Sequence, residues 1–405
     1  MLSRGIEVHC DYWKRNGKDM GAHDTEGKSA SPRSSLRSSP RSSPRSSPPL
    51  QEKSGQAGHD EQDTETPPDD NPGLLQGNAV IEAGGSDEDG EFSASEFDPD
   101  DSSSLRSSST SINSSILEHS YQNGRRYHRY RHGRYPLPND EAEQNREDML
   151  HAMMLEATDG RLFYAPVGDN PQRIADLGTG TGIWAIEIGE KYPSAEVLGL
   201  DLSPIQPTWV PPNVKFYVDD IEDEWLNGDD FDFVHLRNMI PILKSPVTLL
   251  KQAYANMKPG AWVELQDVDG QVHTDDNSIP DDWPLKRFTE IILQAFALYE
   301  TNAHAAVFGG QYLAEAGFVN IKHNYIKLPY GTWPKDKVMR LVGMYYRTAC
   351  EEFFPAIGNL HFPQLGWGKD EMEVFFAECR QSMRDPKVHA YGKMHFWSGQ
   401  KPLDA

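Results

Sequence analysis

The sequence predicts an α/β fold built on a doubly wound, mostly parallel sheet. From residue 171 onward, short apolar runs alternate with segments of helical spacing, a pattern that places helices between parallel strands. The runs 197–200 and 231–234 are largely apolar, as expected for strands covered by helices on both faces. A loop of alternate glycines, 178–182, separates the first strand from the first helix, where ligands bind in such sheets.

The remaining elements follow in chain order. Strands are predicted at 173–177, 196–201, 214–218, 231–236, 261–266 and 319–327, and helices near 183–191, 245–257, 285–300 and 308–316. Residues 335–385 are aromatic and helix-like, and we interpret them as a helical insertion. A last β-like segment, 389–397, is expected to close the sheet as an edge strand.

Composition divides the chain into three parts. Residues 1–115 are rich in Ser, Pro, Gly, Asp and Glu, and they are predicted to be a disordered tail because they bury too little apolar area to offset chain entropy. Within this tail, Arg-Ser-Ser-Pro repeats at 37–48 precede an acidic block at 86–91. The repeats are either a solvated linker or a phosphorylation cluster, since each places a serine before a proline. Residues 116–165 are predicted to form an N-terminal lid with a helix, and 166–405 the α/β domain.

The start of the lid interleaves arginines with aromatic residues between positions 121 and 135. In isolation, this stretch resembles a nucleic-acid-binding arm. It leads, however, into a helix start with Asn139 or Asp140 as N-cap, followed by apolar residues at helical spacing through Leu155. We therefore interpret it as a structured lid on the main domain rather than as an arm that binds RNA or DNA.

Charge and composition argue against several classes of protein. The formal net charge of −23 disfavours a general nucleic-acid binder, because phosphate contacts need a positive surface. We find neither an apolar run of the roughly 18 residues that a membrane span needs nor the order of a secretory signal. The three cysteines are widely spaced, so neither a disulfide framework nor a metal site is expected. A location in the cytoplasm or nucleus is the expectation.

The glycine loop is the centre of the predicted site. Gly178, Gly180 and Gly182 let the backbone turn tightly and approach a ligand that a side chain would block. Asp201 ends the next apolar stretch, about 20 residues downstream, where an acidic side chain meets the two hydroxyls of a nucleoside ribose. Asp176, just before the loop, either orients the loop or binds an amino group. The sequence therefore predicts a site for a nucleoside cofactor.

Two classes of cofactor fit these glycines. Residues 180–185 satisfy the G-x-G-x-x-A pattern of dinucleotide sites. However, the first glycine already ends the strand, the Lys-Pro-Gly turn at 258–260 enters a later strand, and no pyrophosphate-binding constellation appears elsewhere. After the third strand, Asp219 and Asp220 are placed to accept the adenine amine, with Ile221 packing on the ring. Together these features favour S-adenosylmethionine (SAM) as the cofactor.

Several segments resemble those of a known family. They lie at 123–146, 175–225, 231–239 and 257–267. Over 121–402 the chain resembles the fungal LaeA-like (TAM-domain) methyltransferases, a branch of the class I SAM-dependent enzymes, and the run SPIQPTWVPPN at 203–213 is specific to that branch. The resemblance implies a Rossmann-like, seven-stranded methyltransferase domain at 166–405, SAM as methyl donor, and a role in fungal secondary metabolism.

The chemistry of methyl transfer leaves a weak signature in a sequence. The sulfonium methyl is already activated, so the protein mainly aligns the acceptor and excludes water. Strand alternation places His235 and Arg237 on one face after the fourth strand. His235 is the candidate general base, with a hydrogen-bonded structural histidine as the alternative. Tyr127 and Tyr130 of the lid are expected to cover the cofactor.

Three functions are open at this point. The first is an enzyme that methylates a small natural-product intermediate in a closed, aromatic-lined pocket. The second is a nuclear regulator of secondary-metabolite gene clusters, acting in a protein complex and methylating protein or no essential small molecule. The third is a SAM-binding module that has lost its chemistry. Neither direct nucleic-acid binding nor a membrane partner is expected for any of them.

Overall fold

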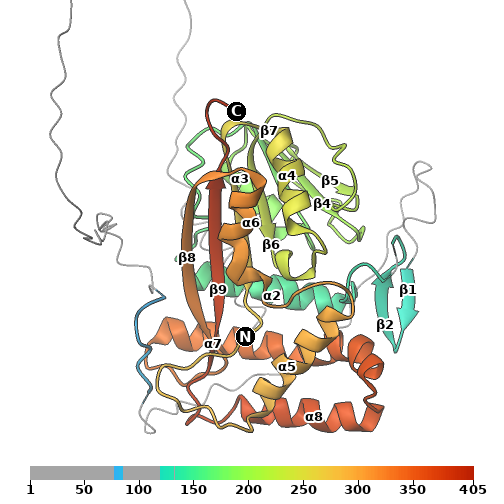
Figure 1. Ribbon diagram of the computed structural model, residues 1–405, viewed down its shortest axis with the longest axis vertical. Coiled ribbons are helices and arrows are strands. Elements are labelled where there is room, and N and C mark those ends of the chain that lie inside the picture. Colours follow the sequence, from blue (N-terminus) through green and yellow to red (C-terminus); the bar gives the residue numbers. More distant parts are fainter. Residues whose placement is uncertain (1–76, 85–118, 132) are drawn as a thin grey trace, which may run out of the picture. The chain divides into compact units, whose positions relative to one another are not determined.

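The computed structural model describes residues 77–84, 119–131 and 133–405. Its main sheet has seven strands in the order β5-β4-β3-β6-β7-β9-β8 (Figure 1). Their bounds are Arg173–Leu177 (β3), Glu196–Asp201 (β4), Val214–Val218 (β5), Phe231–Arg237 (β6), Met257–Val268 (β7), Val319–Pro329 (β8) and Tyr391–Gln400 (β9). Strands β3 to β7 are parallel, whereas β9 is antiparallel to its neighbours. This arrangement confirms the predicted Rossmann-like, mostly parallel sheet.

The last strand lies inside the sheet, so its predicted place at the edge is wrong. Strand β9 pairs with β7 on one side and with β8 on the other. The burial of the two strands gives the reason. Met394 and Phe396 of β9 are buried, whereas Val319 at the start of β8 is 43% exposed. A strand buried along most of its length needs partners on both sides, and the half-exposed β8 takes the edge.

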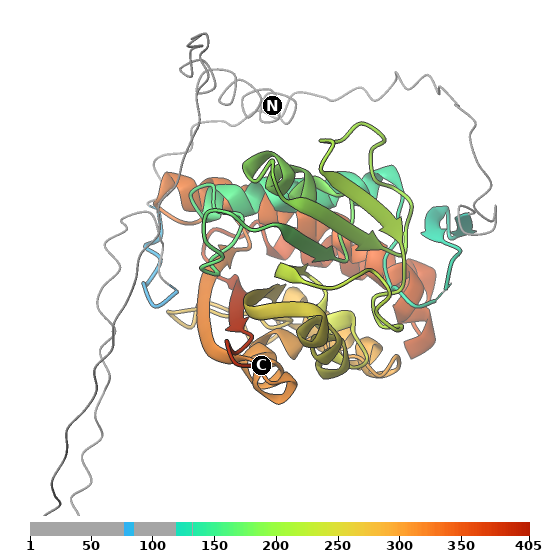
Figure 2. The same cartoon turned by 90° about the horizontal axis from the view of Figure 1, so that it is seen from above.

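Helices cover both faces of the sheet, as the doubly wound pattern requires (Figure 2). On one face lies α3 (Ile183–Lys191), whose Trp184 packs with Phe233. On the other lie α4 (Pro246–Asn256) and α6 (Gly309–Ala316), whose Leu250 and Leu313 share a cluster with Leu177. The sheet residues that form the two clusters are buried, most of them completely, which explains why their sequence shows continuous apolar runs.

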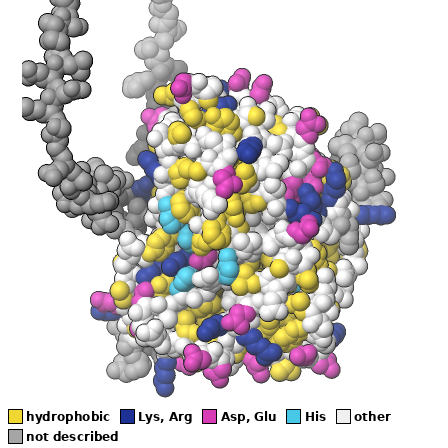
Figure 3. Space-filling view, viewed as in Figure 1, with side chains coloured by type: hydrophobic (Ala, Val, Ile, Leu, Met, Phe, Trp, Pro, Cys, Tyr) yellow, Lys and Arg dark blue, Asp and Glu magenta, His cyan; other side chains and the backbone are white. Residues whose placement is uncertain are grey.

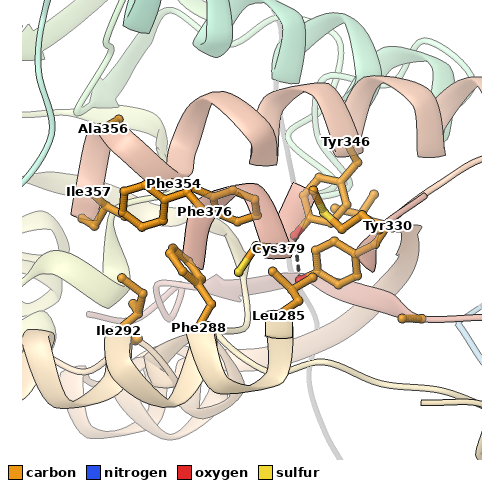
Figure 4. Packing of buried hydrophobic residues seen from close by; sticks show 14 of the residues in the cluster. Leu285, Phe288, Ile292, Tyr330, Tyr346, Phe354, Ala356, Ile357, Phe376 and Cys379 are labelled. Carbon is orange, nitrogen blue, oxygen red and sulfur yellow. Dashed lines mark hydrogen bonds between the residues drawn. The ribbon is translucent and has the colours of Figure 1, made fainter. Parts of the chain in front are cut away.

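A layer of helices lies below the sheet, as drawn in Figure 1. It consists of α2 (Glu141–Ala157), α5 (Pro284–Ala297), α7 (Lys337–His361) and α8 (Lys369–Ser382), with the short helix η3 (Phe362–Leu365) between the last two. Its core is aromatic: the ring centroids of Phe288 and Phe354 are 4.7 Å apart, and Phe376 lies beside them (Figure 4). Helices α7 and α8 lie within 335–385, the range whose sequence is helix-like.

The arginine-rich start of the lid forms a hairpin of β1 (His119–Gln122) and β2 (Arg125–His128). Its arginines form ion pairs within the chain: Arg125 with Asp140, Arg126 with Glu141, Arg131 with Asp223 and Arg134 with Asp220. Asp140 is the N-cap of α2, as one of the two expected residues, and accepts a hydrogen bond from the backbone of Glu143 at 3.1 Å. These contacts support the interpretation of the stretch as a lid.

One segment of the N-terminal tail departs from the expectation of disorder. Residues 77–84 lie beside β8 and the start of α7, where the backbone of Gly84 donates to Trp333 O at 2.8 Å and that of Lys335 to Glu82 O at 2.7 Å. In addition, Lys327 Nζ donates to Ala79 O at 2.7 Å. The segment contains the short apolar run Ala-Val-Ile, but Val80 is 73% exposed, so hydrogen bonds rather than apolar burial hold the segment in place. The Arg-Ser-Ser-Pro repeats and the acidic block at 86–91 lie outside the described residues.

Candidate functional site

A cavity of about 320 Å³ lies between the carboxyl ends of the parallel strands and the helical layer. The glycine loop lines it with residues 178–181, and the acidic strand ends line it with Asp201 and with 219–221. The lid segment 134–139 covers one side, and α5 and α7 line the far end. The structure thus brings together most of the residues predicted to bind the cofactor.

The backbone of the loop requires glycine at each of its three positions. Gly178, Gly180 and Gly182 have φ values of 77°, 55° and 82°, in the left-handed region that L-residues rarely adopt. A Cβ on Gly178 would lie 2.2 Å from Met239 Sδ, and one on Gly182 would lie 2.4 Å from Phe216 Cζ. Gly178 and Gly180 line the cavity, whereas Gly182 is the N-cap of α3 and serves the turn.

Asp201 supports the loop and also faces the cavity. Its two carboxylate oxygens accept backbone hydrogen bonds from Gly180 at 2.9 Å and from Ser203 at 2.8 Å. Burial raises the pKa of this carboxyl to about 6, against the opposing effect of the two amides. A carboxylate offers about four acceptor positions, so acceptor capacity remains for the hydroxyls of a ribose.

The acids after β5 also line the cavity, but each has partners within the chain. Asp219 accepts hydrogen bonds from Asn227 Nδ2 at 2.6 Å and from the backbone of Asp220 at 2.9 Å. Asp220 Oδ2 lies 3.3 Å from Nε of the lid residue Arg134. The lid therefore meets the predicted adenine site directly. The roles of these acids and of Ile221 toward adenine remain predictions.

Asp176 and His235 lie behind the cavity rather than on its lining. They are register partners on β3 and β6, and His235 Nδ1 lies 2.8 Å from Asp176 Oδ1. The other oxygen of Asp176 accepts a hydrogen bond from Thr179 in the loop at 2.6 Å. His235 is fully buried, and its ring stacks on that of Trp184 with 3.7 Å between centroids. Burial lowers the pKa of His235. The geometry favours a hydrogen-bonded structural role for His235 over that of a general base. It also favours Asp176 as a residue that orients the glycine loop.

Replacing His235 with phenylalanine is expected to reduce the free energy of unfolding by about 1–3 kcal/mol. Phenylalanine keeps an aromatic ring against Trp184, but it leaves a buried carboxylate oxygen of Asp176 without its partner. Chemical denaturation of the wild-type and variant proteins measures the difference. A stability equal to or above that of the wild type would contradict the structural role, because removing a purely catalytic group carries no such cost.

Tyr127 does not line the glycine-loop cavity, contrary to its predicted place over the cofactor. It is 4% exposed on β2 and lines an adjoining cavity of about 510 Å³, together with His361 at the end of α7. No residue of the β1–β2 hairpin lines the glycine-loop cavity, whose lining from this part of the chain begins at Arg134. Residues 134–139, which follow, provide the cover that was expected from Tyr127.

Several residues that support or line the cavity carry little signal of this role in the sequence. Gln206 Nε2 donates to Gly180 O at 2.7 Å, and Thr181 Oγ1 donates to Asp148 Oδ1 at 2.7 Å. Glu147 of α2 lines the cavity, as does Arg237 of β6, which the strand pattern placed on one face with His235 but to which it gave no role. The branch-specific run SPIQPTW contains Gln206 and could have indicated its role. Glu147 and Asp148 could not be told from the acidic residues on the solvent-exposed face of any helix.

Histidines gather on the face that carries β8 and β9 (Figure 3). His323 Nε2 lies 2.9 Å from His395 Nδ1, and His395 Nε2 lies 3.4 Å from Asp269 Oδ2. Burial lowers the pKa of His323 to about 4. Across the described ranges, no group of three or more His, Cys, Asp or Glu side chains is arranged to hold a metal ion. In the same ranges, no helix combines the length and apolar character that crossing a membrane demands.

Comparison with known proteins identifies the family. A methyltransferase domain model matches residues 149–322. The methyltransferase pytC of Aspergillus terreus is 37% identical over 298 residues, which cover 73% of this chain and 92% of that protein. The secondary metabolism regulator LAE1 of Cochliobolus heterostrophus is 35% identical over 69% of this chain and 94% of its own length. The protein-methionine methyltransferase laeA of Emericella nidulans is 36% identical over 70% of this chain and 76% of its own length. The chain therefore belongs to the fungal LaeA-like family of class I SAM-dependent methyltransferases.

Proposed function

We propose that this enzyme transfers a methyl group from SAM to a small, largely apolar acceptor of fungal secondary metabolism. The observation that carries the proposal is the apolar lobe of the cavity beyond the glycine loop. Its lining comes from α5 and α7 and includes Leu285, Phe288, Ile292, Tyr346, Ala349, Phe353, Phe354 and Ile357. Several of these side chains converge in Figure 4. Enclosed apolar lobes with few polar groups are typical of small-molecule sites.

The described residues fit the charge and shape of the proposed cofactor. SAM, when bound, supplies an electrophilic methyl group on a positively charged sulfur. Because Gly178 and Gly180 have no Cβ atoms, the loop allows the methionine portion of SAM to approach the backbone closely. Asp201 retains acceptor capacity for the ribose. The apolar walls orient the acceptor and keep water from competing with it.

A second candidate function is methylation of protein within a regulatory complex. It is supported by the names of relatives, among them a secondary metabolism regulator and a protein-methionine methyltransferase. A methionine side chain is unbranched and apolar, so it suits the same lobe of the cavity as a small molecule. In that case the acceptor enters as part of a polypeptide, and the proposed location is the nucleus rather than the cytoplasm.

Replacing Ala349 with tryptophan is expected to block acceptors while preserving the cofactor site. Ala349 is 2% exposed on α7 and lines the apolar lobe. The indole ring would fill part of the lobe and displace the acceptor, so we expect acceptor turnover to fall about tenfold or more. The same overpacking is expected to lower the free energy of unfolding by about 1–3 kcal/mol. The full-length wild-type and variant proteins are incubated with methyl-labelled SAM and a fungal extract, and the label is counted separately in solvent-extracted small molecules and in protein. Binding of S-adenosylhomocysteine is measured as the control for the cofactor site.

The two fractions separate the candidate functions. Label in small molecules that Ala349→Trp abolishes supports the first proposal. Label confined to protein favours the regulator. Small-molecule methylation that proceeds in the variant at the wild-type rate would overturn the assignment of the lobe as the acceptor site.

A further inference from the structure

Two ionisable side chains line the cavity near the glycine loop, and neither has an ion-pair partner among the described residues. They are Glu147 of α2 and Arg237 at the end of β6. Neither charge belongs to the ribose or adenine sites described above. Buried charges are costly unless they are paired. Their common position against the loop therefore points to a ligand with matching charges.

Glu147 reaches from the helical layer to the loop. Its Oε2 atom is buried, accepts no hydrogen bond from the described residues, and lies 2.7 Å from the position that a Cβ on Gly180 would take. Burial, together with the nearby charge of Glu143, raises the pKa of Glu147 to about 8. The carboxyl group is thus held beside the point of closest backbone approach, where it lacks a donor.

Arg237 lies on the β6 side of the same loop. It follows Leu236, whose register partner Leu177 immediately precedes Gly178. Its Nη1 donates to His151 Nδ1 at 2.9 Å, and within the described ranges it forms no ion pair with a carboxylate. Burial lowers its pKa. A guanidinium has five donors in a planar fork, so one bond to a histidine uses a small part of its capacity.

We propose that Glu147 and Arg237 bind the α-amino acid end of the cofactor, with Glu147 taking the ammonium and Arg237 the carboxylate. The inference rests on the proposed function and adds which residues recognise the zwitterionic tail. A single α-amino acid supplies both missing partners: N–H donors for Glu147 and a bidentate acceptor for the arginine fork. The neighbouring cation Arg146 does not compete, because its Nη2 is paired with Glu143 Oε1 at 2.5 Å.

The test compares nucleosides that have and lack this tail. Affinities of the full-length protein for S-adenosylhomocysteine, decarboxylated SAM and 5′-methylthioadenosine are measured by calorimetry for wild type, Glu147→Gln and Arg237→Met. Loss of a hydrogen bond to a charged group corresponds to about 10- to 100-fold in affinity. We expect each variant to lose that much affinity for S-adenosylhomocysteine, and to bind 5′-methylthioadenosine within about twofold of wild type. Arg237→Met is further expected to remove the preference for the carboxylated ligand over decarboxylated SAM.

The matched control is Glu156→Gln, which removes an exposed carboxylate from the same helix. It is expected to bind all three ligands like the wild type. Wild-type affinity of Glu147→Gln or Arg237→Met for S-adenosylhomocysteine would overturn the inference. So would an equal loss for 5′-methylthioadenosine, because the residues would then act through the fold rather than on the tail. A wild-type protein that binds none of the ligands would refute the proposed function instead.

Discussion

Replacing Gly180 with valine is expected to lower the affinity for S-adenosylhomocysteine more than about 100-fold. The residue has φ of 55°, and an L-residue in the left-handed region costs about 1–2 kcal/mol, with β-branched side chains affected most. Its Cβ would also lie 2.7 Å from Glu147 Oε2, and the added methyl groups would fill space that the cofactor's tail needs. Calorimetry and ligand-dependent thermal stabilisation measure the loss.

Gly366→Val is the matched control for backbone strain. Gly366 also has a left-handed backbone, with φ of 89°, but a Cβ there would meet nothing within 4 Å. The control is expected to lose stability to a similar degree and to retain cofactor affinity. Binding by Gly180→Val within about threefold of the wild type would show that the glycine loop does not contact the cofactor.

Replacing Trp184 with alanine is expected to lower the free energy of unfolding by about 3–5 kcal/mol, as large aromatic truncations in protein cores do. Trp184 is 1% exposed, stacks on His235, and donates from Nε1 to Leu162 O at 2.9 Å. Its removal leaves a cavity under α3 and uncovers the buried pair of His235 and Asp176. Denaturant titration followed by circular dichroism measures the change.

Trp209→Ala supplies the comparison for that measurement. Trp209 is 94% exposed, and surface substitutions usually change stability by no more than about 0.5 kcal/mol. A loss below about 1 kcal/mol for Trp184→Ala would mean that α3 can collapse onto the sheet, and that the stacked pair contributes little to the core.

The sequence predicted the parallel half of the sheet closely and the antiparallel half less well. The predicted strands 173–177, 196–201 and 214–218 match β3, β4 and β5. Buried parallel strands are continuous apolar runs, which a sequence shows directly. Strand pairing is a long-range property, so the place of β9 between β7 and β8 had no local signal. The β1–β2 hairpin did have one: its turn is Asn123-Gly124, the strongest short hairpin signal.

The candidate site shows the same division between local and long-range information. The glycine loop and Asp201 were found because a tight turn and a strand end restrict residue type within a short window. Glu147 was missed because a carboxylate on α2 looks like any solvated helix residue until the helix is placed against the loop. Arg134, which meets Asp220, was likewise hidden in a stretch that favoured a lid without showing which of its residues cover the cavity.

The position of β9 has a consequence for the order in which the protein folds. Strand β8 is synthesised earlier than β9, yet it joins the sheet only through β9. Helices α7 and α8 lie between the two strands in the chain. Strand β8 therefore cannot join the sheet until β9 has paired with β7. Contacts of such long sequence separation are slow to form, and apolar surface stays exposed until they do. We therefore expect a substitution that disrupts the pairing of β9 to leave β8 unpaired and apolar surface exposed in the newly synthesised chain.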